Sequence, residues 1–186
     1  ITLSNNDVAS YASGTGSTAI VFTTTIAQGD TDSSDLSVSS IDSDAGGATM
    51  KDSAGNSVSE TVTAGDLGTV TVDGAVPVFS SVAATDGAYG VGDVLTITCT
   101  WGEAVVTSDG TLTLDNADVA AYSSGSGTTA LVFTTTIAEN DGTDADVAVS
   151  AYGGTIADAA GGTAGAASGD LGAVSIDGDA PDYSSI

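Results

Sequence analysis

The stretch "DVLTITCTW", residues 93–101, alternates apolar and polar side chains. Leu95, Ile97, Cys99 and Trp101 fall on one face of an extended chain, and the residues between them fall on the other. A period of two residues is typical of a β-strand with one buried face. We therefore expect this strand to face a hydrophobic core, with Cys99 as a buried, reduced thiol and Trp101 as a core side chain.

Six further stretches in the same part of the chain have strand patterns and are separated by turns rich in Gly, Ser and Asp. They are "VFSSVAAT" from Val78, "TLTL" at 111–114, "VAAY" at 119–122, "TALVFTTTI" at 129–137, "DVAVSAY" at 146–152 and "LGAVSI" at 171–176. No stretch carries a helical period. Seven short strands in about 105 residues indicate an all-β, immunoglobulin-like sandwich.

The same pattern is written twice. "VASYASGTGSTAIVFTTTIA" at residues 8–27 matches "VAAYSSGSGTTALVFTTTIA" at residues 119–138, which lies 111 positions later. "GDLGTVTVDGAVP" at residues 65–77 matches "GDLGAVSIDGDAP" at residues 169–181, which lies 104 positions later. The chain is therefore predicted to consist of tandem immunoglobulin-like repeats of about 104–111 residues, because loops absorb such small length changes cheaply.

The predicted boundaries place a first repeat at residues 1–76, a second, complete repeat at 77–181, and the start of a third at 182–186. Ile1 aligns with Leu112, so the first repeat is expected to lack its first two strands. Its core should then have an open groove, which we expect beside Ile1, Leu3, Val8, Ile20 and Phe22.

The residues resemble a known family. "DGAYGVGDVLTITCTWGEAV" from residue 86, "TLTLDNADVAAYSSGSGTTALVFTTTIA" from residue 111, "GGTIADAAG" from residue 153 and the "DGDAP" linker carry the resemblance. They are similar to the bacterial immunoglobulin-like tandem repeats of giant secreted adhesins and cell-surface proteins, including those of marine bacteria and cyanobacteria. The resemblance implies a rigid, calcium-stiffened spacer or adhesive stalk at the cell surface.

Composition excludes several functions. The only basic residue, Lys51, stands against 25 acidic residues, and the formal net charge is −24. Such a chain is repelled by nucleic acid and by anionic membrane surfaces, and it has no apolar run long enough to span a bilayer. It has no His or Arg to activate a nucleophile. We expect no enzyme, no nucleic-acid partner and no membrane insertion.

Acidic residues are predicted to gather at the ends of each repeat, where the loop after the fifth strand meets the end of the last strand. Crowded carboxylates without bases favour a bound hard cation, and oxygen ligands suit Ca²⁺. Adaptation to high salt is the competing explanation of the acidity. The predicted calcium ligands are Asp30, Asp35 and Asp73 with Glu103 and Asp158 at one junction, and Asp141, Asp146, Asp177 and Asp179 at the next.

Two functions fit these patterns. The first is a non-enzymatic structural or adhesive module of a large secreted bacterial surface protein, in which neighbouring repeats form an extracellular array and other domains contact a host or matrix surface. The alternative is a self-assembling subunit of an extracellular filament or surface layer, in which identical chains are joined by strand addition. Sugar binding is a minor third reading, because only Trp101 and a few Tyr could stack on a ring.

Overall fold

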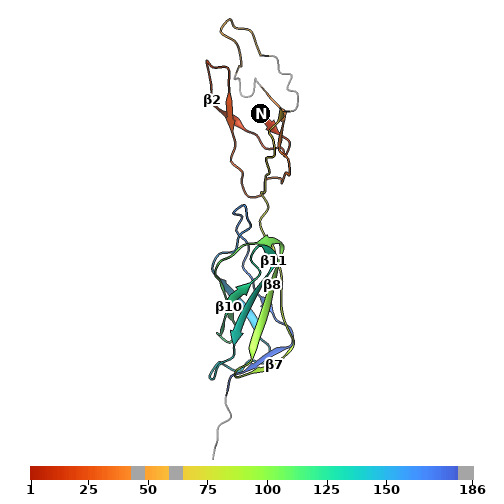
Figure 1. Cartoon of the computed structure of the whole chain (residues 1–186), viewed down its shortest axis with the longest axis vertical. Coiled ribbons are helices and arrows are strands. Elements are labelled where there is room, and N and C mark those ends of the chain that lie inside the picture. Colours follow the sequence, from red (N-terminus) through yellow and green to blue (C-terminus); the bar gives the residue numbers. More distant parts are fainter. Residues whose placement is uncertain (43–48, 59–64, 180–186) are drawn as a thin grey trace, which may run out of the picture. The chain divides into compact units, whose positions relative to one another are not determined.

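The chain forms two compact units, residues 1–75 and 76–186 (Figure 1). The structure is a computed structural model and describes residues 1–42, 49–58 and 65–179. Within these ranges every regular element is a β-strand and there is no helix, which confirms the all-β prediction. The predicted start of a third repeat, residues 182–186, lies outside the described residues.

The second unit is built on a seven-stranded antiparallel sheet with the order β13-β12-β9-β10-β11-β8-β6. The sheet curls back on itself, so that its edge strands β13 and β6 lie close together. A Cβ added to Gly169 on β13 would lie 3.1 Å from Val82 Cγ1 on β6. The strands are β6 (Phe79–Ala84), β8 (Val94–Val105), β9 (Thr111–Leu114), β10 (Val119–Ser124), β11 (Thr128–Thr136), β12 (Ala148–Gly153) and β13 (Gly169–Asp170).

A second, parallel pair completes this unit: β7 (Gly87–Gly90) runs beside β14 (Val174–Asp177). All seven strands expected from the sequence are present, and β7 and β13 are additional short strands. This topology bears out an all-β unit rich in sheet, and the finer assignment as an immunoglobulin-like sandwich stays a prediction.

The core of the second unit follows the alternation of β8. Leu95, Ile97 and Cys99 are fully buried and Trp101 is 2% exposed, as their shared face predicts. The Trp101 ring packs edge-to-face on Phe79, with ring centroids 5.7 Å apart, a favoured arrangement for aromatic pairs. β8 is paired on both sides, with β11 and with the edge strand β6.

The first unit has less regular structure. One sheet joins β1 (Thr2–Leu3), β4 (Ser37–Ser40) and β5 (Gly65–Asp66), and a hairpin joins β2 (Ser10–Ser13) to β3 (Val21–Thr23). Its buried cluster consists of Leu3, Leu36, Val38 and Val72. The prediction that Leu3 lies beside an open groove is wrong: Leu3 is 4% exposed, because β1 pairs with β4 and places Leu3 in this cluster.

The turns of the two units repeat the same backbone conformations. Asn6 and Ala117, which are 111 positions apart, have φ of 73° and 72° in the turn after the first aligned strand. Gly14 and Gly125 have φ of 113° and 105° in the turn between the next two strands. A left-handed conformation is cheap for Gly and costly for most other residues. The backbone therefore turns in the same way at these aligned positions in both units.

Candidate functional site

Hydrogen bonds tie the acidic loop at residues 28–33 to the end of the first unit. The Gly29 N–H donates to the Gly74 carbonyl oxygen at 2.8 Å. Asp32 Oδ1 accepts from the backbone N–H groups of Gly74, at 2.8 Å, and Ala75, at 3.2 Å. A Cβ on Gly74 would collide with the backbone oxygen of Asp30. Asp30 and Asp73 therefore share one end of this unit.

The second unit builds the same end from aligned residues. The Asn140 N–H donates to the Gly178 carbonyl oxygen at 3.0 Å. Thr143, at the position of Asp32, donates from Oγ1 to Asp179 Oδ2 at 3.0 Å and to Asp177 Oδ1 at 3.4 Å. The carboxylates of Asp177 and Asp179 are thus held side by side through one hydroxyl.

Four of the predicted ligands lie at or beside these two ends. Asp30 Oδ2 and Asp141 Oδ2 each accept a backbone N–H three residues earlier, from Ala27 and Ala138, at 2.6 Å in both units. Asp35 and Asp146 follow in the next turn, and both are exposed. The aligned carboxylates occupy the same local structure in both units, and each leaves oxygen lone pairs for a further partner.

Asp158 is the one buried acidic residue of the described chain, with 4% of its surface exposed. Its Oδ1 accepts from the N–H groups of Ala160 and Gly162, both at 2.8 Å, so it closes a tight loop as Asp often does. Its Oδ2 is buried and has no hydrogen-bond partner. A buried carboxylate oxygen without a partner is costly and calls for an ion or a donor.

The aligned loop of the first unit explains this difference. Asp52 Oδ1 accepts from the N–H groups of Ala54 and Asn56, and Asp52 Oδ2 accepts from the Asn56 side chain at 2.8 Å. The Asn56 side chain is the main reason that the pKa of Asp52 lies below its usual value. In the second unit Gly162 replaces Asn56 and has no side chain. The second oxygen of Asp158 has therefore lost the donor that its counterpart keeps.

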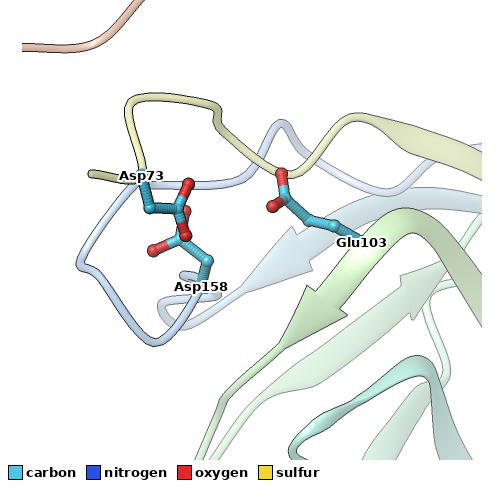
Figure 2. A group of neighbouring side chains, drawn as sticks. All are labelled: Asp73, Glu103 and Asp158. Carbon is cyan, nitrogen blue, oxygen red and sulfur yellow. The ribbon is translucent and has the colours of Figure 1, made fainter. Parts of the chain in front are cut away.

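Glu103 brings a second carboxylate to Asp158. A carboxylate oxygen of Glu103 lies within 4.8 Å of a carboxylate oxygen of Asp158. β8 continues through Gly102 to Val105, so Glu103 lies within the strand. Figure 2 draws this pair together with Asp73, which belongs to the first unit. A junction that joins Asp73 to this pair stays a prediction.

The chemistry available here is that of hard oxygen donors. Two carboxylates in close approach repel each other when both are ionised, and a divalent cation relieves this repulsion. Asp, Glu and backbone carbonyl oxygens are the ligand types that Ca²⁺ takes. The residues present therefore fit a calcium ion better than a transition metal, because no His is present and the single Cys is elsewhere.

Sequence reasoning missed two features of these sites. Thr143, which bridges two carboxylates, is visible only when the repeats are aligned and Thr143 is found at the position of Asp32. The partnerless Oδ2 of Asp158 has one sequence signal, the replacement of Asn56 by Gly162. Cys99, by contrast, is confirmed as a buried free thiol, and burial raises the pKa of this thiol to about 12. It is therefore protonated and unreactive at neutral pH.

In the ranges that the structure describes, no helix has the length and apolar character needed to cross a bilayer. No family model, curated protein or solved structure matches this chain.

Proposed function

We propose that this chain is a structural module of a large secreted bacterial surface protein. In this proposal its two units are immunoglobulin-like repeats of a tandem array outside the cell, and the array acts as a spacer or adhesive stalk without enzymatic activity. Its partners are neighbouring repeats, and domains beyond the repeats would contact a host or matrix surface. The family that the sequence resembles is the source of the extracellular assignment.

One observation carries the proposal: both units build the same acidic end from aligned residues. Asp30 and Asp73 in the first unit correspond to Asp141 and Asp177 in the second. A catalytic carboxylate pair is needed once, in a shaped cleft. Carboxylates that recur at the same end of successive units serve the construction of the array.

Calcium is the proposed stiffening ion. The partnerless Asp158 Oδ2 beside Glu103 supports this assignment, because it supplies a buried oxygen that needs a positive charge. The aligned acidic ends around Asp73 and Asp177 would contribute further oxygen ligands. When bound, calcium would neutralise carboxylates that otherwise repel one another in a chain of net charge −24.

The test is thermal unfolding of the 186-residue chain, followed by Trp101 fluorescence, in calcium and in chelator. A ligand that binds only the folded state at about ten times its Kd adds roughly 1.4 kcal/mol, which shifts Tm by about 4–8 °C for a unit of this size. Asp158→Asn should abolish most of this shift. It should also raise the Tm in chelator, because it removes the repulsion with Glu103.

Asp170→Asn is the matched control. It removes the same charge from an exposed residue whose Oδ1 accepts the Gly172 N–H at 2.7 Å, and Asn keeps this acceptor. The calcium shift should survive in this variant. If sodium chloride of equal ionic strength stabilises wild type and both variants as much as calcium does, the acidity is an adaptation to salt and the calcium proposal fails.

A further inference from the structure

One five-residue loop is closed by the same backbone hydrogen bonds in both units. The N–H of its first residue, Asp52 or Asp158, donates to the carbonyl oxygen of its fifth, Asn56 or Gly162, at 2.9 Å. Oδ1 of each Asp accepts the N–H groups of the third and fifth loop residues at 2.8–2.9 Å. An isolated bridge between the two flanking residues closes the base of each loop. The two loops can therefore be compared position by position.

The loops differ in the side chain of their fifth residue. In the first unit Asn56 Nδ2 donates to Asp52 Oδ2 at 2.8 Å, so both carboxylate oxygens have a partner. In the second unit Gly162 has no side chain, and Asp158 Oδ2 is buried with no hydrogen-bond partner among the described residues. The second loop therefore keeps the backbone of the first and lacks the donor for one oxygen.

The Asn56 amide stabilises the charged form of the carboxylate beside it. The pKa of Asp52 lies below its usual value, and the hydrogen bond from the Asn56 side chain is the main cause. A bound cation favours the ionised carboxylate in the same direction, through its charge. Asp158 has only 4% of its surface exposed, so water offers little of this stabilisation at its second oxygen.

The second-unit loop is fixed to the strand that carries the neighbouring carboxylate. The Val106 N–H donates to the Ala157 carbonyl oxygen at 2.7 Å, and the Ala157 N–H donates back to Val106 at 3.3 Å. Val106 directly follows β8, which contains Glu103. A carboxylate oxygen of Glu103 lies within 4.8 Å of one of Asp158 (Figure 2). Both carboxylates and Gly162 therefore belong to the second unit and are held together by its own hydrogen bonds.

We propose that the calcium ion of the second unit takes the place that the Asn56 amide has in the first, so that the residue at position 162 decides whether this loop depends on calcium. Gly162 leaves the second oxygen of Asp158 open to a cation. An Asn at the same position fills this place with a neutral donor. In an array of such repeats, the fifth loop residue would then distinguish loops that need calcium from loops that do not.

This inference rests on the calcium site of the proposed function and adds the residue that governs it. Position 162 accepts a side chain, because Gly162 does not share the positive φ of Gly161 and Asn56 stands at the aligned position. The variant Gly162→Asn can therefore adopt the hydrogen bond seen in the first unit. Its amide would donate to Asp158 Oδ2, where the cation would otherwise bind.

Calcium affinity and Tm of the full chain test the proposal, the first by titration calorimetry and the second by Trp101 fluorescence in calcium and in chelator. Gly162→Asn should weaken calcium binding roughly tenfold or more, because the ion must displace a hydrogen bond to a charged group. The same variant should raise the Tm in chelator. Its calcium-dependent shift in Tm should therefore be smaller than that of wild type.

Two further substitutions at the same position are the matched controls. Gly162→Ala adds a Cβ without a donor and should keep the calcium affinity of wild type. Gly162→Asp has the shape of Asn with acceptor oxygens only, so it should lower the Tm in chelator and enlarge the calcium shift.

The outcomes separate this inference from the calcium proposal on which it rests. If Gly162→Asn binds calcium as wild type does while Asp158→Asn does not, position 162 is not the determinant and only this inference fails. Equal gains in Tm from Asn and Ala in chelator, or an Asp variant with the wild-type calcium shift, also overturn it. A wild-type chain that binds no calcium overturns both.

Discussion

Ala117 adopts a left-handed backbone conformation that its side chain does not favour. Its φ is 72°, and the aligned residue of the first unit, Asn6, has nearly the same value. Asn tolerates this region better than Ala. Ala117→Asn is therefore expected to raise the free energy of unfolding of the second unit by about 0.5–1 kcal/mol.

Denaturant unfolding followed by Trp101 fluorescence measures this change, because Trp101 is buried in the second unit. Ala117→Ser is the control: Ser is polar and similar in size, but it does not favour the left-handed region. An equal gain with Ser would show that the backbone conformation is not the cause.

The sequence predicts the acidic residues of the candidate site, but it does not predict the unpaired oxygen of Asp158. Aligned repeats and turn positions were sufficient to place Asp30 with Asp73 and Asp141 with Asp177 near the ends of units. The unpaired oxygen of Asp158 depends on the absence of one side chain at Gly162, four residues away. Such an effect arises from the hydrogen-bond geometry of the folded loop, so residue types and spacing alone do not reveal it.

At the scale of elements, the β10–β11 hairpin depends on two glycines with different surroundings. Gly125 has φ of 105°, and a Cβ there would collide with the Ala130 carbonyl oxygen, whereas Gly127 has φ of 84° and open space around it. Gly127→Ala should cost only the backbone strain, about 1–2 kcal/mol. Gly125→Ala should cost clearly more, because the turn must also shift.

Thermal and denaturant unfolding of both variants check this prediction. Equal losses of stability in the two variants would mean that the hairpin turn relaxes freely around Gly125. Gly14→Ala in the first unit offers a repeat of the experiment, since an added Cβ there meets the Ala19 carbonyl oxygen in the same way.

Strand positions were predictable where alternation was strong and were not where pairing alone made the strand. "TLTL" coincides with β9, and all of the alternating "DVLTITCTW" except Asp93 lies in β8. β7 reads "GAYG" and contains two glycines, so it has little strand propensity, and it is a strand because β14 lies beside it. The same cause extends β8 past Gly102 to Val105, since β11 pairs with β8 as far as Val105.

At the scale of the whole molecule, the two units differ in the size of their cores. Among the described residues, the buried cluster of the second unit has 18 members and that of the first has four. Local stability follows buried apolar contact. Amides in β2 and β3 are therefore expected to exchange faster than those in β10 and β11 by on the order of a hundredfold or more.

Hydrogen exchange of the aligned segments 10–23 and 121–134 gives this comparison within one sample, because the segments have equal length and similar sequence. Equal protection in both segments would show that protection does not follow the size of the buried core.

The single cysteine can report mechanical unfolding of the second unit. Cys99 lies in the middle of β8, which is paired on both sides, and its sulfur is sealed from solvent. A pulling force that separates β8 from its sheet would expose this thiol to solvent. Disulfide exchange with a dissolved reagent would then report the unfolding of the second unit. The first unit has no cysteine, so its unfolding would produce no thiol reaction. Stretching a chain between two beads would thus report the failure of one unit alone, without any engineered label.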